Sequence, residues 1–312
     1  MILFIGCLID MWFRNLRIFR LDEGWRFDAS SLGELLEKTR FQPCGATDQV
    51  SQGWVPPRGV EGEMVVAVGG QQLLALGTEQ KLLPGSVVRQ YVNERASELE
   101  AAQGYRPGKG QMREIRESVT AELLPRAFVR RRLTYVWVDP VGRWLGVDVA
   151  SAAKADEVIE QIKLALDALP LLPIRTALSP SAAMTQWLAE GEAPSGLTID
   201  RDCELRSLVE EKATVKYSRH SLDIGEVKPH LEAGKKATRL ALTWDDRVSF
   251  VLTEDMHVKR LAFLDVLKEA SEQQAGDGDA SALFEADFAI MAGEFSRFLP
   301  ALIEALGGEA EA

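Results

Sequence analysis

The segment "TRLALTWDDRVSFVLTEDMHVKRLAF" (residues 238–263) decides the fold class, because apolar and polar side chains alternate along it with the two-residue period of β-strands. Three strands are predicted, at residues 238–244, 247–252 and 257–263. The segments between them are short, and short connections join antiparallel neighbours, so we expect a meander. Outward positions such as Arg239, Thr243, Arg247 and Ser249 predict one wet face with basic and hydroxyl side chains.

Helical periodicity appears on both sides of this meander. Ser151 is expected to cap a helix with an apolar stripe of 3.6-residue period. Near the C-terminus, apolar side chains recur at steps of three and four, with Pro300 predicted to kink the helix or to start a new one. The residues of this stripe are Phe284, Phe288, Met291, Phe295, Phe298 and Leu302. An intramolecular core is the favoured interpretation of the stripe, and a partner helix is the alternative.

Two further helices are predicted within residues 81–127, separated by "GYRPGKG" (residues 104–110). Their apolar stripes are narrow, so the helical hairpin is expected to pack against another part of the assembly, with a second subunit as the candidate. Pro125 should end the second helix, after which residues 128–137 alternate as a strand. On this strand Phe128, Arg130 and Arg132 share one face, whereas Arg131 lies on the apolar side and is expected to form a local ion pair.

Shorter patterns complete an α+β prediction. Strands are expected at residues 14–21 and 171–177, and a hairpin at residues 64–76 around Gly69-Gly70. Helices are expected at 181–190 and after a cap at Ser30 or Ser31, and a flexible linker at 271–280. The predicted organisation is an N-terminal extension (1–10), a central α+β region (11–80 with 128–190), the helical hairpin (81–127), a second α+β region with the meander and C-terminal helix (191–308), and a tail (309–312).

The charge is unevenly distributed along the 312 residues, whose formal net charge is −11. Residues 106–143 contain nine basic and four acidic side chains, whereas residues 265–312 contain two basic and eleven acidic ones. The acidic total argues weakly against a nucleic-acid partner, because binding depends on where the charge lies. A basic region is therefore hidden by the acidic total.

Cysteine and histidine usage predicts neither a metal nor a cofactor. Cys7, Cys44 and Cys203 lie far apart, which fits a reducing cytoplasm, and the three histidines share no ligand spacing. No phosphate-binding glycine loop is present in the sequence. Residues 1–10 lack the features of a signal peptide, no segment is long enough to span a bilayer, and translation starting at Met11 is an alternative explanation of the extension.

Two acidic doublets are the best enzymatic lead. Asp245-Asp246 and Glu254-Asp255 lie at strand ends, where carboxylates could hold divalent metal ions for phosphodiester hydrolysis. The favoured interpretation is that both doublets are hairpin turns, in which Asp is common. The turns would then lie at opposite ends of the middle strand.

The basic lead consists of cations on or beside strands, with few aromatic side chains between them. Such a pattern suits contacts with phosphates, which position a protein on DNA without reading its sequence. A solvated surface that is paired with its own carboxylates is an equal alternative. The residues are Arg130, Arg132, Lys235, Lys236, Arg239, Lys259 and Arg260, with Arg126 beside them.

Several short strings, in this order along the chain, resemble the bacterial recombination-associated protein RdgC family. They are "MWFRNL" (11–16), "FQPCG" (41–45), "GWVPP" (53–57), "LLPRAF" (123–128), "EAGK" (232–235), "KRL" (259–261) and "LIEALGGEA" (302–310). The resemblance runs from Met11 almost to the end, and the strings are specific in combination.

The resemblance implies a non-enzymatic protein that binds double-stranded DNA with little sequence preference. Members of this family are expected to form a ring-shaped homodimer from two curved, horseshoe-like subunits, closed by two interfaces around a positively lined hole. The implied role is to restrain the strand-exchange recombinase, in the cytoplasm and at the nucleoid, without a cofactor.

Carried over residue by residue, the resemblance makes Phe128 a subunit contact and makes Lys235, Arg239, Lys259 and Arg260 candidates for the DNA-facing surface. Arg126 is a candidate for either the subunit interface or the surface of the hole. A departure lies at Ser218-Arg219-His220, where the family is expected to have a lysine-rich string near a ring-closing contact. Arg219 and His220 are therefore interface candidates, and the residue pairs that they form across the interface are expected to differ from those of the family. A metal-dependent nuclease and a regulator that acts on the recombinase directly stay as alternatives.

Overall fold

The computed structural model describes residues 11–59, 62–166, 169, 171–172, 174–207, 213–276 and 278–310. The predicted N-terminal extension lies outside these residues. Within them, no helix has both the length and the hydropathy that a membrane-spanning segment needs.

A single antiparallel sheet of twelve strands runs through the described residues, in the order β2-β4-β5-β6-β1-β12-β11-β10-β8-β9, with β3 beside β4 and β7 beside β1. The segment 238–263 forms β10, β11 and β12 as predicted, near the middle of that order. The strands are β1 (Asn15–Leu21), β2 (Val50–Val55), β3 (Val66–Val68), β4 (Gln71–Leu82), β5 (Phe128–Asp139), β6 (Trp144–Val147), β7 (Leu171–Leu172), β8 (Leu197–Ser207), β9 (Thr214–Tyr217), β10 (Lys235–Trp244), β11 (Val248–Thr253) and β12 (His257–Phe263).

Eight α-helices in the described residues complete the α+β fold that the sequence predicts. A short 3₁₀ turn, η1 (Leu124–Arg126), joins the second helix of the hairpin to β5. The helices are α1 (Ala29–Glu37), α2 (Gly85–Gln103), α3 (Lys109–Leu123), α4 (Ala152–Ala165), α5 (Pro180–Glu190), α6 (Ile224–Glu232), α7 (Asp265–Ala275) and α8 (Ala280–Ala305).

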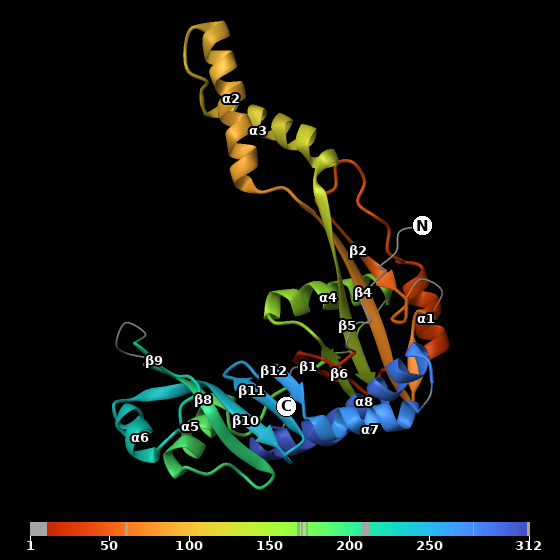
Figure 1. The fold of residues 1–312 in the computed structure, drawn as a ribbon, viewed down its shortest axis with the longest axis vertical. Coiled ribbons are helices and arrows are strands. Elements are labelled where there is room, and N and C mark those ends of the chain that lie inside the picture. The colour runs from red at the N-terminus through yellow and green to blue at the C-terminus, as the bar shows by residue number, and fades with distance from the viewer. Residues whose placement is uncertain are drawn as a thin grey trace.

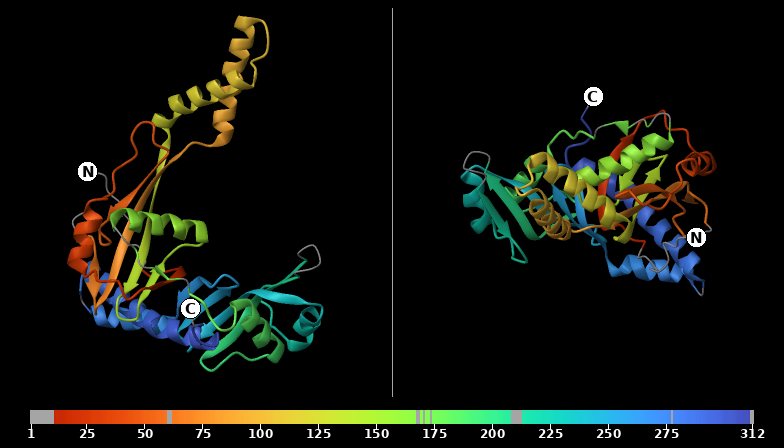
Figure 2. Two further views of the ribbon diagram at one scale, coloured as in Figure 1. Left: turned by 180° about the vertical axis from the view of Figure 1, so that it is seen from behind. Right: turned by 90° about the horizontal axis from the view of Figure 1, so that it is seen from above.

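The molecule is elongated and bent (Figure 1). The predicted helical hairpin, α2 with α3, stands away from the body beyond the ends of the long strands β4 and β5. The strands β8 and β9 lie with α6 at the other end of the sheet, as both views in Figure 2 also show. The two ends of the molecule are therefore separated by the full width of the sheet.

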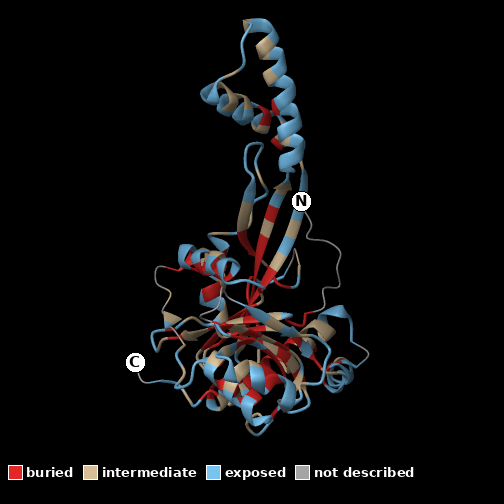
Figure 3. Cartoon of the chain, turned by 90° about the vertical axis from the view of Figure 1, so that its left-hand side faces the viewer, coloured by how far each residue is buried: buried red, intermediate tan, exposed pale blue. Residues whose placement is uncertain are grey.

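The two faces of the sheet are buried by different helices. Helices α5, α6, α7 and α8 pack on one face, over a core that contains Trp137, Phe250, Phe288 and Phe295. Helices α1 and α4 cover the other face over β2, β4, β5, β6 and the end of β1, around Trp54 and the apolar side chains of α4. Burial is concentrated in the body, whereas the hairpin is largely exposed (Figure 3).

Helix α8 confirms the interpretation of the aromatic stripe as core. Phe288, Phe295 and Phe298 are fully buried within the same chain. The helix continues through Pro300, so the prediction of a new helix there was wrong. Buried Glu294 accepts hydrogen bonds from Arg247 Nε at 3.2 Å and Nη2 at 2.7 Å, which ties α8 to the start of β11.

Four local predictions need correction. Asp28, not Ser30 or Ser31, caps α1, because its side chain accepts a hydrogen bond from Ser31 N. The strand expected at 171–177 is reduced to β7 and an isolated bridge between Thr176 and Glu309. Helix α7 runs through the first half of the predicted linker 271–280. Finally, β8, β9 and α6 were missed.

Candidate nucleic-acid interface

The pairing register places cations from distant parts of the chain on one face of the sheet. Side chains of directly paired residues point to the same face of an antiparallel sheet. Val136 pairs with Val147, Val147 with Arg17, and Arg17 with His257. Because Arg130 and Arg132 precede Val136 by even steps on β5, they share this face with Arg17 and with the cations of β12.

The same face continues through the meander. Lys259 pairs with Asn15 on one side and Val251 on the other. Arg239 pairs with Thr253 and with Glu204. The core beneath α1 and α4 reaches the end of β1, at Leu21, and contains no described residue of β8, β10, β11 or β12. We call the uncovered part, on β8, β10, β11 and β12, the open face; it carries Asp202, Glu204, Arg206, Lys236, Arg239, Lys259 and Arg260.

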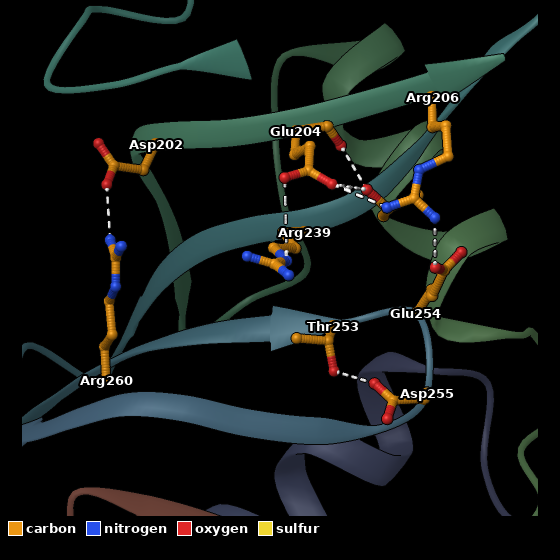
Figure 4. Close-up of polar contacts among 9 residues, drawn as sticks. Asp202, Glu204, Arg206, Arg239, Thr253, Glu254, Asp255 and Arg260 are labelled. Atoms are coloured by element: carbon orange, nitrogen blue, oxygen red, sulfur yellow. Dashed lines mark hydrogen bonds and ion pairs between the residues drawn. The ribbon is translucent and has the colours of Figure 1, made fainter. Parts of the chain in front are cut away.

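Ion pairs cross the open face between strands (Figure 4). Arg260 Nη1 lies 3.1 Å from Asp202 Oδ2, and its backbone φ of 49° marks a bulge in β12. Arg206 lies 3.0 Å from Glu204 and 3.3 Å from Glu254. Arg239 Nε is 4.0 Å from Glu204, a loose pair. Cations and carboxylates therefore alternate across this surface.

Two carboxylates, Glu204 on the open face and Asp255 at its edge, have lowered pKa values. Burial alone would raise the pKa of Glu204, but the Thr238 hydroxyl, Arg239 and Arg206 outweigh it and keep this pKa below its usual value. At the edge of the face, the pKa of Asp255 is also lowered, because the Thr253 hydroxyl and Arg17 outweigh the effect of burial. The partners of Glu204 and Asp255 therefore favour the ionised form of these two carboxylates.

Other predicted cations have no carboxylate partner among the described residues. Lys236 and Lys259 form no salt bridge with any described residue, and neither does Arg132. Arg130 donates a hydrogen bond to Gln80 Oε1 at 3.1 Å. Lys235 pairs with Ser207, on the face that α5 to α8 cover, so it lies apart from the open face.

Arg131 forms an ion pair, as predicted, but its partner is not local: Glu79 lies 52 positions earlier, directly opposite on β4. Its Nε donates to the buried Glu79 Oε2 at 2.8 Å. Glu79 also accepts a hydrogen bond from the backbone N–H of Cys44 at 3.0 Å, so it fastens the loop before β2 to β4. Burial would raise the pKa of Glu79, but these partners outweigh it and keep the pKa below its usual value.

The first interface candidates lie where the hairpin joins the sheet. Phe128 is 85% exposed, and Arg126 is exposed in the turn before it. Leu82, which pairs with Phe128 across β4 and β5, and Val129, the next residue along the chain, are exposed as well. A phenylalanine side chain so fully exposed, with apolar neighbours, is typical of a contact surface.

The second pair of candidates lies at the opposite end of the sheet. Arg219 has a positive φ of 53°, and its backbone N–H donates to Asp202 Oδ1 at 2.6 Å. His220 Nδ1 lies 2.7 Å from the Ser221 carbonyl oxygen and 3.6 Å from Glu226 Oε2. Both residues follow the edge strand β9, so they are accessible at the border of the sheet.

The acidic doublets are hairpin turns, as the favoured interpretation had it. Asp245 and Asp246 have φ of 50° and 51° in the turn between β10 and β11, and Glu254-Asp255 form the turn between β11 and β12. The doublets therefore lie at opposite ends of β11. Within the described ranges, no three His, Cys, Asp or Glu side chains gather as a metal ion would require.

Three residues of the open face escaped sequence analysis, namely Asp202, Glu204 and Arg206. They belong to β8, whose sequence "LTIDRDCELRS" carries a usable signal. Leu197, Ile199, Cys203 and Leu205 alternate there with polar residues, which is typical of a half-buried strand.

Comparisons with known proteins agree on one family. A family model described as "Putative exonuclease, RdgC" matches residues 11–309. A recombination-associated protein RdgC from Dechloromonas aromatica (strain RCB) is 55% identical over 302 residues, which cover 96% of this chain and 98% of the relative. The proteins of the same name from Herminiimonas arsenicoxydans (50% over 299 residues; 96% and 99%) and Cupriavidus necator (51% over 302 residues; 97% and 100%) match equally broadly. Because these matches span nearly the whole chain, this protein belongs to the RdgC family.

Proposed function

We propose that this chain is a non-enzymatic protein that binds the phosphate backbone of double-stranded DNA through the open face, together with Arg130 and Arg132. One observation carries the proposal: the register of a single sheet aligns cations from β5, β10 and β12 on the same face. The names of the relatives, which refer to recombination, support a DNA substrate. Contacts of this kind would be independent of base sequence.

The ion pairs of the open face do not oppose this role. Exposed salt bridges contribute only about 0–1 kcal/mol each. A phosphate could therefore replace the carboxylate in the more exposed pairs, Arg260 with Asp202 and Arg206 with Glu254, at small cost. Arg239 is only loosely paired, and Lys236 and Lys259 are not paired with a described carboxylate. These three side chains are therefore the first candidates for phosphate contacts.

The proposal includes a homodimer in which two bent, horseshoe-like subunits encircle DNA. The exposed apolar surface around Phe128 supports one contact, and Arg219 with His220 supports a second contact at the other end of the sheet. A ring would retain DNA topologically and would need few strong phosphate contacts. Such a dimer would restrain the strand-exchange recombinase by occupying its DNA, at the nucleoid.

The experiment is a binding titration with two unrelated duplexes of equal length at several salt concentrations. Each phosphate contact releases condensed counterions, so affinity should fall steeply with salt. Arg239→Glu should lower the affinity for both duplexes by at least about tenfold. The matched control Lys163→Glu, on the exposed side of α4, should leave both affinities unchanged. Salt-independent binding, or loss on only one duplex, would refute a backbone role.

The alternative of a nuclease is favoured by the description of the family model alone. Incubation of supercoiled and linear DNA with the pure protein and Mg²⁺ or Mn²⁺ tests it. Degradation of the DNA that is lost in Asp245→Asn or Asp255→Asn would overturn the non-enzymatic proposal. DNA that stays intact would exclude the nuclease hypothesis. A variant that loses DNA binding but still inhibits strand exchange would favour direct action on the recombinase.

A further inference from the structure

A hollow of about 430 Å³ lies where β1 begins and β12 ends, close to the first turn of α7. This volume falls within the range of small-molecule sites. Trp12 and Phe263, which are nearly buried and pack on each other with ring centroids 4.7 Å apart, form an apolar floor of the hollow. The Arg14 carbonyl oxygen accepts a hydrogen bond from Leu261 N at 2.9 Å, which fixes the two strands that form the hollow.

Cations surround this hollow. Arg14, Arg260 and Lys268 line it, and its described lining contains no carboxylate. One carboxylate lies beside it, since Asp148 Oδ1 accepts hydrogen bonds from the backbone N–H groups of Arg14 and Asn15. Arg14 and Lys268 are exposed and form no salt bridge with a described residue. Arg260 is shared with Asp202, 3.1 Å away on the open face. The hollow consequently has an excess of positive charge that Arg14 and Lys268 supply.

The combination of an apolar floor and free cations selects the class of ligand. Cations alone would suit any small anion, and an apolar floor alone would suit any uncharged ring. A nucleotide has both parts, because it joins a flat base to a phosphate that guanidinium and ammonium groups bind well. We propose that this hollow binds one nucleotide, with its phosphate at Arg14 and Lys268 and its base toward Trp12 and Phe263.

Two sources could supply such a nucleotide: a free mononucleotide or the phosphorylated end of a DNA strand. Neither requires that DNA be encircled, so the site does not depend on the proposed function. Calorimetric titration of the full-length protein with dAMP, and with deoxyadenosine and inorganic phosphate as partial ligands, tests the site. Saturable binding of dAMP below about 1 mM is expected, and each partial ligand should bind at least about tenfold more weakly.

The variants Arg14→Glu and Lys268→Glu should each weaken dAMP binding at least about tenfold, since each removes a charge-assisted contact. Lys268→Arg should retain binding, and Lys38→Glu, an exposed control outside the lining, should not change it. Thermal melting checks that every variant is folded. The absence of dAMP binding, or equal binding by the glutamate variants, would overturn the proposal.

A short single strand with a 5′-phosphate, titrated as a competitor of dAMP, separates the two sources. If the strand displaces bound dAMP at a lower concentration than added free dAMP does, strand ends are the ligand. If the strand does not displace bound dAMP, free nucleotides are the ligand. Arg239→Glu, which tests the open face, should leave dAMP binding unchanged. Loss of duplex binding in that variant with dAMP binding intact would separate the two sites.

Discussion

One face of the sheet has two contrasting halves. Over β2, β4, β5 and β6 it is covered by α1 and α4, and its side chains, such as Val136 and Val147, are buried. Over β8, β10, β11 and β12 the same face is open and carries Glu204, Arg239 and Lys259. No described helix covers it there.

The contrast shows how one continuous sheet serves stability and binding with the same geometry. In the covered half, apolar residues exclude water and hold the helices in place. In the open half, the residues at equivalent register positions are charged, so a covering helix would have to bury their ion pairs at a large desolvation cost. The composition of each half therefore decides whether the face becomes core or surface.

The largest effect should come from breaking the covered half. Ile162 of α4 is buried at 1% exposure in the core beneath that helix. Ile162→Ala should lower the free energy of unfolding by about 2–4 kcal/mol, because it removes apolar contacts and leaves a cavity. Urea denaturation measures the change. Arg239→Ala, on the open half, should change it by less than about 1 kcal/mol, and equal losses would contradict the contrast.

The next largest effect is expected at Phe128, the exposed apolar side chain at the start of β5. Phe128→Asp should weaken self-association at least about tenfold, because it puts a charge into a contact surface that is apolar. Analytical ultracentrifugation over a range of concentrations measures the dimer constant. Val141→Asp is the matched control, since Val141 is 90% exposed in the turn between β5 and β6. Self-association that is unaffected by Phe128→Asp would remove this surface from the interface.

A smaller effect is expected at the border between the halves. Asp148, directly after β6, accepts hydrogen bonds from Arg14 N at 3.2 Å and Asn15 N at 2.8 Å, and burial raises its pKa from 3.8 to about 6. The folded state therefore binds more protons than the unfolded state between about pH 4 and pH 6, and this residue's contribution to stability falls as the pH rises through that window.

Asp148→Asn should remove this dependence while keeping an oxygen that accepts both hydrogen bonds. At pH 7.5 the variant should be more stable than the parent by about 1–2 kcal/mol, and the difference should disappear near pH 4. His257, whose pKa burial lowers, titrates in the opposite sense in both proteins, so the difference between the two melting profiles isolates Asp148. A lower stability of Asp148→Asn at pH 7.5 would contradict the prediction.

The smallest effect should come from removing one carboxylate from the open face. Glu204→Gln frees Arg206 and Arg239 from their partner and should raise affinity for duplex DNA about two- to threefold at low salt, with the gain shrinking as salt increases. Glu192→Gln, exposed in the loop after α5, is the control. Reduced affinity in Glu204→Gln would mean that the ion pairs position the arginines for DNA.

Local patterns predicted most of the elements but not their neighbours. The alternation of β10, β11 and β12, the stripe of α8 and the hairpin of α2 and α3 were all readable, since each depends on residues a few positions apart. The linker predicted at 271–280 overlaps the second half of α7, because glycine and charged residues follow that helix closely. Strand β8, whose alternation is interrupted at Arg201, was not predicted, and it carries three of the seven residues named on the open face.

The sequence by itself determined most of the segments that form strands and helices, the side of β5 on which Arg131 lies and the turns at the acidic doublets, because backbone propensity and side-chain alternation are local properties. Only the tertiary structure decided that β1 lies between β6 and β12 and so joins two regions into one sheet. It likewise decided that Arg239 and Arg132 share a face, and that Arg260 meets Asp202 across 58 positions of chain. Such partners are selected by long-range strand pairing, whose register no short segment contains.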